Sequence, residues 1–237
     1  AIPWEKLEYQ HIQAIRSKLL ETASPATANR YLTALRRVLK EAWRLGYISA
    51  EEYQRSADVP SVKGERIPAG RELTRAEIRA LMNDCISDKK RNTGTRDAAI
   101  IALMYAGGLR RDEVIGANNY DPATGKLVII GKRNKQRTVY INNGAADALE
   151  DWLDLRGDGP GPIFLAINKG DKIRLGKQLS PQAIYGMLAK RAENAKVRDF
   201  SPHDLRRTFI SDLLDAGVDI TTVSKMAGHA SVNTTAR

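Results

Sequence analysis

Residues 201–217 read SPHDLRRTFISDLLDAG and contain the signals of a helix start. Ser201 is a favourable N-cap, Pro202 fits the first helical position, and Asp204 lies three residues after the cap. The apolar positions recur with helical spacing and form one packing stripe: Leu205, Phe209, Ile210, Leu213 and Leu214. The sequence therefore predicts an amphipathic helix that begins after Ser201.

His203 and Arg206 are three residues apart, so this helix places them on one face of its first turn. Backbone N–H groups and the helix dipole favour an anion at that end. In isolation, the same spacing also fits a surface histidine and a salt-bridged arginine. The meaning of the pair therefore depends on other residues of the chain.

A second candidate, Arg110, follows two glycines in GGLRRDEV, residues 107–114. The glycines break an apolar helix, and LRRDEV starts a new turn. A structural explanation is also open, in which Arg110 begins that helix and pairs with Asp112 or Glu113.

Two further candidates lie in turns. The segment KLVIIGKRNKQRTVYI, residues 126–141, has two β-branched runs around a polar turn, which predicts a hairpin with Lys132 at its tip. His229 follows Gly228, which is typical of a helix C-cap. Taken singly, a tip lysine is usually only solvated, and a histidine after a C-cap is often incidental.

Composition limits the classes of function. The chain has 237 residues, 42% of them hydrophobic, and a formal net charge of +10, which favours a polyanionic partner. Its longest apolar run, 98–109, is too short to span a membrane, so we expect a cytoplasmic protein. A single cysteine excludes an internal disulfide, and three histidines lack zinc-ligand spacing, so no metal is expected.

The N-terminal part predicts helices over 3–21 and 24–46. The apolar side of the second helix consists of Leu32, Leu35, Val38, Leu39, Ala42 and Trp43. Its other side is basic and consists of Arg30, Arg36, Arg37, Lys40 and Arg44. Such a face is often only solvated, but Glu41 is the single acid among these bases, which also fits contact with a phosphate backbone.

The stretch 60–70, PSVKGERIPAG, has the composition of a linker, with a domain boundary near Arg66. We therefore expect a helical domain over 1–66 and a second domain over 67–237. Beyond the linker, helices are predicted over 73–85, 95–117, 143–157 and 180–195, with a short strand or buried loop at 162–167. The expected fold class is mainly α with a small antiparallel sheet or hairpin, a helical domain preceding an α+β domain.

The motifs GGLRRDEV, GKRNKQR, HDLRRTF and GH occur in this order along the chain. The ordered set resembles the catalytic domain of the tyrosine recombinases, the family of phage integrases and Xer-type proteins. The resemblance runs from about Glu72 to the end, and the preceding helical segment resembles the family's core-binding domain. It implies a site-specific DNA recombinase that cuts and rejoins strands through a 3′-phosphotyrosyl intermediate without a cofactor.

The resemblance also implies residue roles. Arg110 and Arg206 would form a phosphate clamp, because a guanidinium donates paired hydrogen bonds to phosphate oxygens. His203 would act as a base toward the attacking phenol or as a phosphate donor, and His229 as a second phosphate donor. Glu113 would orient the clamp.

Lys132 matches the family's hairpin lysine, which protonates the leaving 5′-oxygen. Lys135 is the alternative, because a slip of one residue in the hairpin register would exchange the two lysines. Double-stranded DNA is the implied partner. The residues expected to contact it are Arg30, Arg36, Arg37, Lys40, Arg44, Arg133, Lys135 and Arg207.

In the family the nucleophilic tyrosine lies on the helix after the Gly-His pair, which places it at position 238, one residue beyond Arg237. None of the eight tyrosines present matches that position. We therefore expect a chain trimmed at both ends that cannot cleave DNA and is monomeric without it. The full-length protein is expected to form a homotetramer on paired sites in the nucleoid.

Two other functions stay open at this point. A non-catalytic DNA-binding regulator would keep the phosphate clamp without the nucleophile. A type IB topoisomerase would share the chemistry and relax supercoils without a specific site, although the compact helical first domain argues against it.

Overall fold

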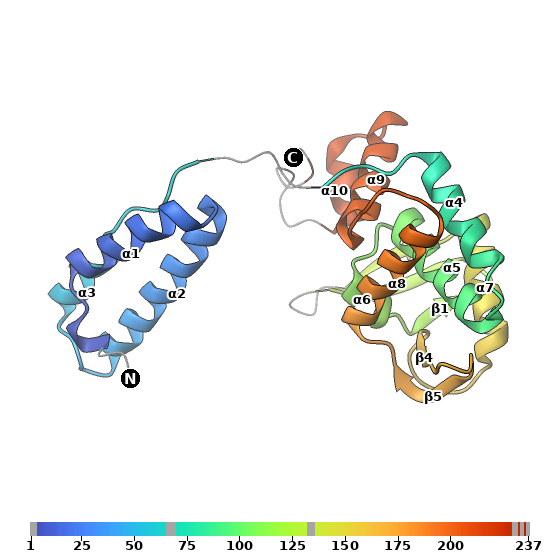
Figure 1. The fold of residues 1–237 in the computed structure, drawn as a ribbon, viewed down its shortest axis with the longest axis horizontal. Coiled ribbons are helices and arrows are strands. Elements are labelled where there is room, and N and C mark those ends of the chain that lie inside the picture. Colours follow the sequence, from blue (N-terminus) through green and yellow to red (C-terminus); the bar gives the residue numbers. More distant parts are fainter. Residues whose placement is uncertain (1–3, 65–69, 132–135, 229–231, 233–234, 236–237) are drawn as a thin grey trace. The chain divides into compact units, whose positions relative to one another are not determined.

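The computed structural model describes residues 4–64, 70–131, 136–228, 232 and 235. The chain divides into two compact units, Ala1–Pro68 and Ala69–Arg237 (Figure 1). Each unit has its own hydrophobic core. The boundary expected near Arg66 falls among residues 65–69, which lie outside the described part.

In its described residues, all regular secondary structure of the first unit is helical. Its elements are a 3-10 turn η1 (Trp4–Lys6), α1 (Tyr9–Thr22), α2 (Pro25–Arg44) and α3 (Ala50–Ala57). The helix predicted from residue 3 starts later, because Glu8 and His11 form a capping box that begins α1 at Tyr9. Its core is formed by Ile12, Ala28, Leu32, Leu39, Ala42, Ile48, Val59 and Val62.

Helix α2 corrects three details of the expected amphipathic pattern. Val38 and Trp43 leave 38% of their surface exposed instead of packing in the core, and Trp43 stacks on Tyr53 with ring centroids 5.4 Å apart. The half-buried guanidinium of Arg36 donates to the backbone carbonyls of Ala57 and Val59. Arg36 therefore fastens the end of α3 to α2 and does not belong to the exposed basic row.

The second unit contains seven helices and two small antiparallel sheets among its described residues. The helices are α4 (Arg75–Ile86), α5 (Arg91–Ala106), α6 (Arg111–Ile115), α7 (Gly144–Arg156), α8 (Pro181–Asn194), α9 (Pro202–Asp215) and α10 (Ile220–Ala227). The strands are β1 (Asn119–Asp121), β2 (Lys126–Ile130) and β3 (Gln136–Tyr140) in one sheet, and β4 (Leu165–Ile167) and β5 (Ile173–Gln178) in the other.

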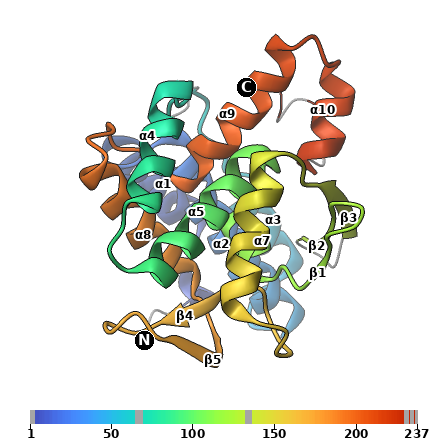
Figure 2. The same cartoon turned by 90° about the vertical axis from the view of Figure 1, so that its right-hand side faces the viewer.

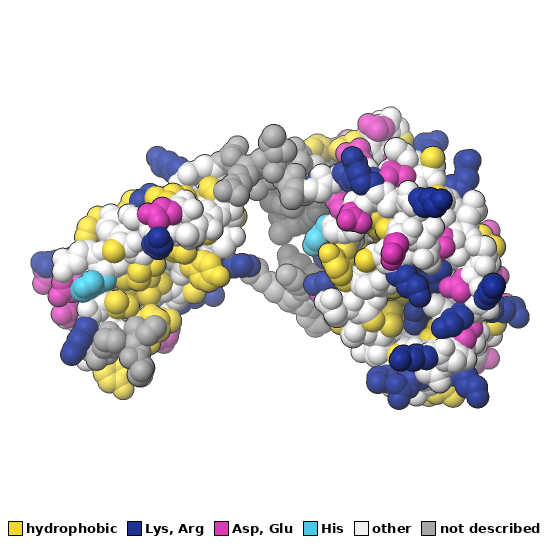
Figure 3. Space-filling view, viewed as in Figure 1, with side chains coloured by type: hydrophobic (Ala, Val, Ile, Leu, Met, Phe, Trp, Pro, Cys, Tyr) yellow, Lys and Arg dark blue, Asp and Glu magenta, His cyan; other side chains and the backbone are white. Residues whose placement is uncertain are grey.

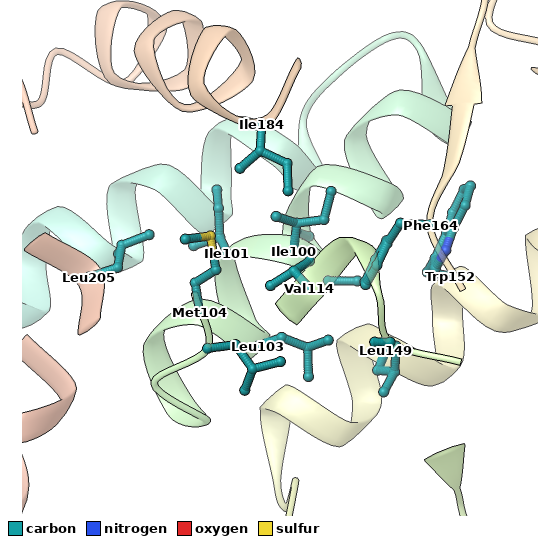
Figure 4. Close-up of a cluster of buried hydrophobic side chains, with 14 of the residues drawn as sticks. Ile100, Ile101, Leu103, Met104, Val114, Leu149, Trp152, Phe164, Ile184 and Leu205 are labelled. Atoms are coloured by element: carbon teal, nitrogen blue, oxygen red, sulfur yellow. The ribbon is translucent and has the colours of Figure 1, made fainter. Parts of the chain in front are cut away.

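Helix α5 lies in the middle of this unit, with α4, α8 and α7 around it (Figure 2). It is apolar on nearly every side, as expected for a helix enclosed by others. Its buried side chains Ile100, Ile101, Leu103 and Met104 meet others from α6 to α9 (Figure 4): Val114, Leu149, Trp152, Phe164, Ile184 and Leu205. The turn after α5, which leads to Arg110, is therefore anchored in the core.

The predicted hairpin is present as β2 and β3, which pair from Lys126↔Tyr140 to Ile130↔Gln136. The sequence did not predict β1, which adds a third strand beside β2, or β5, which pairs with β4. Strand β5 escapes a pattern-based prediction because its segment IRLGKQ is almost entirely exposed and has no buried alternation.

Candidate active site

The first turn of α9 is fixed by a buried carboxylate. Asp204 accepts hydrogen bonds from the backbone N–H groups of Ser201, at 2.8 Å, and of Arg71, at 2.9 Å. The first contact caps the helix, and the second ties it to the segment that opens the unit. His203 and Arg206 leave this turn on the same face.

Arg206 is buried, with 4% of its surface exposed. Its Nη1 donates to the carbonyl of Gly108 at 2.6 Å, and its Nη2 donates to the carbonyl of Ala227 at the end of α10. Burial and the neighbouring charge of Arg110 lower the pKa of Arg206 to about 9, so the guanidinium stays charged at neutral pH.

Arg110 is the N-cap residue of α6. Its backbone N–H donates to Oε2 of Glu113 at 2.8 Å, and its Nη1 donates to Oε1 of the same carboxylate at 2.8 Å. Its Nη2 lies 3.4 Å from the carbonyl oxygen of Gly228, to which it donates. Arg110 and Arg206 thus donate to the carbonyls of two consecutive residues, which brings them together at the end of α10.

Glu113 is also held by a residue that was not among the predicted site residues, Arg137 of β3. Its Nη1 and Nη2 donate to Oε1 and Oε2 of Glu113 at 2.7 and 2.9 Å. Burial alone would raise the pKa of Glu113, but the hydrogen bonds from Arg137 and from the Arg110 backbone outweigh it and hold the pKa at about 2. The carboxylate is therefore ionised at any working pH.

His203 lies within the field of this arginine cluster. Loss of water around part of its imidazole lowers its pKa, and the charges of Arg206, Arg110 and Arg111 lower it further. The direction of the shift makes the neutral imidazole the main form at pH 7 and leaves a lone pair to accept a proton.

Four predicted residues, Lys132, Arg133, Lys135 and His229, lie outside the described part of the chain, so their roles stay predictions. The structure fixes the segments on either side of them. Strand β3 begins at Gln136, opposite Ile130, and Gly228, the C-cap residue of α10, has a left-handed conformation with φ of +66°.

The predicted DNA-contacting residues of α2 differ in their environment. Arg30, Arg37 and Lys40 are exposed. Arg44 is exposed as well and forms a salt bridge with Glu41 at 2.8 Å. In the second unit, Arg207 lies half-buried beside Gly70, where a Cβ would be 3.1 Å from its Nη1. Figure 3 shows Lys and Arg side chains on the visible face of both units.

The described tyrosines of the second unit are engaged elsewhere or exposed. The hydroxyl of Tyr105 donates to Asp212 at 2.7 Å, and burial together with this carboxylate raises its pKa to about 12. Tyr120 donates to Glu150 at 3.3 Å. Tyr140 and Tyr185 are 62% and 47% exposed.

No group of three or more His, Cys, Asp or Glu side chains suited to a metal ion occurs in the part of the chain that the structure describes. Among the same residues, no helix has the length and apolar character needed to cross a membrane.

Residues 71–237 match the model of the phage integrase family. The chain therefore belongs to this family. Within it, the chain is similar to Xer proteins. The tyrosine recombinase XerD of Lacticaseibacillus casei is 32% identical over 233 residues, which cover 94% of this chain and 75% of the relative. The tyrosine recombinase XerC of Pelobacter propionicus is 33% identical over 214 residues, which cover 89% and 67%.

Solved structures with the same fold include DNA complexes. The XerH site-specific recombinase bound to a palindromic difH substrate has a TM-score of 0.73 at 20% identity, with 98% of this chain and 66% of that chain covered. The integrase of transposon Tn1549 with transposon right end DNA has a TM-score of 0.74 at 17% identity, covering 99% and 81%. At these identities the likeness shows the fold alone.

Gly108 gives a test of how the core positions Arg206, one of the two arginines of the predicted clamp. Its φ is +58°, and a Cβ there would lie 2.3 Å from Cδ1 of Phe209. We expect Gly108→Ala to destabilise the protein by at least about 1–2 kcal/mol from the left-handed backbone alone. Because the Gly108 carbonyl accepts from Arg206, we also expect DNA cleavage by the full-length protein to fall about 10²-fold.

Thermal unfolding and single-turnover cleavage measure the two effects. The matched control is Gly186→Ala, because Gly186 lies in α8, where an added Cβ would meet nothing within 4 Å and alanine favours a helix. Equal melting temperatures for the two variants would show that the Gly108 turn tolerates a side chain.

Proposed function

We propose that this protein is a site-specific DNA recombinase that cuts and rejoins strands through a 3′-phosphotyrosyl intermediate. One observation carries the proposal. Arg110 is the N-cap of α6 and Arg206 lies in α9, yet they donate to the carbonyls of the adjacent residues Gly228 and Ala227. This convergence, with His203 in the same electrostatic environment, provides the cation cluster that a phosphodiester transition state requires.

In the proposed reaction a tyrosine oxygen attacks the phosphorus and forms a pentacoordinate phosphorane. Arg110 and Arg206 neutralise its non-bridging oxygens. The phosphorus–5′-oxygen bond then breaks and the 3′-phosphotyrosyl bond remains, until the 5′-hydroxyl of another strand reverses the step. The phosphodiester energy is kept in the link, so the reaction needs no cofactor.

Proton transfer and further phosphate contacts are assigned to His203, Lys132 and His229. Neutral His203 accepts the proton of the attacking phenol or donates to the phosphate. Lys132 donates a proton to the leaving 5′-oxygen, with Lys135 as the alternative. His229, which follows the carbonyl that Arg110 binds, donates a second hydrogen bond to the phosphate.

We assign the nucleophile to a tyrosine beyond Arg237. The hydroxyls of Tyr105 and Tyr120 are bonded to carboxylates and not to the clamp, which supports this assignment. DNA contacts are assigned to Arg30, Arg37, Lys40 and Arg44 of α2 and to Arg133, Lys135 and Arg207. We further propose that the full-length protein forms a tetramer on paired sites in the nucleoid of the cytoplasm, and that the 237-residue chain is monomeric without DNA.

A covalent-adduct assay tests the proposal. Random duplexes are first selected with the full-length product of the gene, and a nicked version of the enriched site is then used as a trapping substrate. We expect a denaturation-resistant adduct that mass spectrometry identifies as phosphotyrosine, and binding without an adduct for the 237-residue chain.

Each other outcome identifies a different function. Binding without an adduct by the full-length protein would make it a DNA-binding regulator. Relaxation of supercoiled plasmids that lack the enriched site would make it a topoisomerase. An adduct formed by the 237-residue chain would place the nucleophile among its own eight tyrosines.

A further inference from the structure

We propose that Arg137 of β3 is a positioning residue, which holds Arg110 in its phosphate-binding orientation through the shared carboxylate of Glu113. The proposal rests on the recombinase function proposed above. Arg137 lies on the hairpin strand β3 and binds Glu113, the carboxylate that also binds Arg110.

The carboxylate of Glu113 is divided evenly between the two arginines. Its Oε1 accepts from Nη1 of Arg110 and Nη1 of Arg137, and its Oε2 accepts from the backbone N–H of Arg110 and Nη2 of Arg137. The paired bonds from Arg137 fix the plane of the carboxylate. That plane in turn fixes the position of Nη1 of Arg110, whose Nη2 donates to the carbonyl of Gly228.

Arg137 itself is poorly placed to bind phosphate because its charge is paired with the Glu113 carboxylate, whereas the Nη atoms of Arg206 donate to neutral backbone carbonyls. Both of its Nη atoms donate to Glu113, and only 15% of its side chain is exposed. Its Nε is buried and has no hydrogen-bond partner among the described residues. By contrast, 31% of the Arg110 side chain is exposed. We therefore expect Arg110 to bind the ligand and Arg137 to hold Arg110 in position.

Charge explains why a second arginine is needed. Glu113 is 4% exposed, and a carboxylate buried to that degree with a single partner would tend to bind a proton. A protonated Glu113 would release Arg110 from its ion pair and leave it beside Arg206 with no compensating charge. The fork of Arg137 keeps Glu113 ionised and so keeps Arg110 in place.

Arg137 also contacts the turn after α10. A Cβ on Gly228 would lie 3.1 Å from Cδ, 3.2 Å from Nη1 and 3.3 Å from Nε of Arg137. The carbonyl of this glycine accepts from Arg110. The Arg137 side chain therefore lies against two segments: α6, whose N-cap is Arg110, and the turn at Gly228, which precedes His229.

The first test needs no activity. Carbon-13 NMR of the Glu113 carboxyl in the 237-residue chain measures its pKa in the parent protein and in Arg137→Gln. We expect a carboxylate that stays ionised to about pH 2 in the parent and titrates above its ordinary value of about 4.3 in the variant. An unchanged pKa in a folded variant would overturn the proposal.

The second test uses the full-length protein and single-turnover cleavage. We expect Arg137→Gln to lower the rate about 10–100-fold with little change in DNA affinity, and to add a rate loss at acidic pH as Glu113 binds a proton. Arg137→Lys, which keeps the charge without the fork, should recover only part of the rate. The control is Lys126→Gln, which removes an exposed charge from the neighbouring strand β2.

A double mutant separates positioning from direct contact. If Arg137 acts through Glu113, Arg137→Gln should cost little more in a Glu113→Gln background. Multiplicative losses would instead indicate that Arg137 contacts the DNA itself. A variant that melts earlier but keeps the parent's pH profile would show a purely structural role. Absence of cleavage by the parent protein would refute the recombinase function. The Glu113 pKa measured by NMR would then still test whether Arg137 holds this carboxylate in its ionised form.

Discussion

Replacing Arg206 by alanine is expected to lower DNA cleavage by the full-length protein about 10³-fold or more. The guanidinium is buried and donates to the carbonyls of Gly108 and Ala227, so a cation at the surface cannot take its place. A charge fixed in advance in a dry site costs no reorganisation when the phosphorane forms. Arg206→Lys should remain at least about 10²-fold impaired, because an ammonium cannot donate the paired bonds of a guanidinium.

Single-turnover adduct formation on the nicked substrate measures this effect, and equilibrium binding measures affinity separately. We expect affinity to change far less than the rate, because most of the binding free energy comes from many phosphate contacts. The matched control is Arg79→Ala, which removes an exposed arginine from α4. An Arg206→Ala variant that cleaves as fast as this control would remove Arg206 from the phosphate clamp.

The local elements of this fold could be predicted from the sequence because their signals are local. The Ser201 cap, the Asp204 capping position and Pro202 define the start of α9, and the structure has that start. The hairpin follows from two β-branched runs, and Gly107 and Gly108 mark the break between α5 and α6. Family resemblance, rather than spacing, linked these elements into one site.

Pairings between distant segments could not be predicted in this way. Arg36 has the helical position of a basic-face residue, but its carbonyl partners come from the end of α3 and the segment after it. Arg137 alternates with its neighbours in β3 like any strand residue, and only the fold shows that Glu113, from a different element, is its partner. Such pairs depend on tertiary contacts that a single sequence does not encode as a periodic pattern.

The site as a whole has a net positive charge that matches its proposed ligand. Arg110, Arg137 and Arg206 contribute three positive charges, and Glu113 contributes one negative charge. Glu113 reduces the repulsion among the three arginines, so the cluster can form in the protein without DNA. Its remaining positive charge still attracts a phosphate anion. This balance explains why a carboxylate lies inside the proposed phosphate site.

Replacing Arg191 by methionine is expected to unfold the second unit at neutral pH or to destabilise it by about 3–5 kcal/mol. Arg191 is 4% exposed and donates to three carboxylates: to Asp84 at 2.9 Å, Asp88 at 2.7 Å and Asp97 at 2.8 Å. Arg96 is a second cation on Asp97, so Asp84 and Asp88 lose the most. The variant leaves these carboxylates without their shared buried cation.

The pH dependence distinguishes this cause from a simple loss of packing. In the parent, burial opposes ionisation of Asp88, but the hydrogen bonds from the Lys90 backbone and from Arg191 lower the pKa of its carboxyl. The ionised carboxylate therefore stabilises the folded protein above the unfolded-state pKa, and this stabilisation is lost as the pH falls. Without Arg191 the carboxylate pKa values should rise, so protonation at lower pH should relieve the destabilisation. The stability gap between parent and variant should therefore shrink from pH 8 to pH 5, as measured by urea unfolding. The control Arg79→Met, which replaces an exposed arginine on α4, should show no gap. A gap for Arg191→Met that stays constant with pH would indicate lost packing instead.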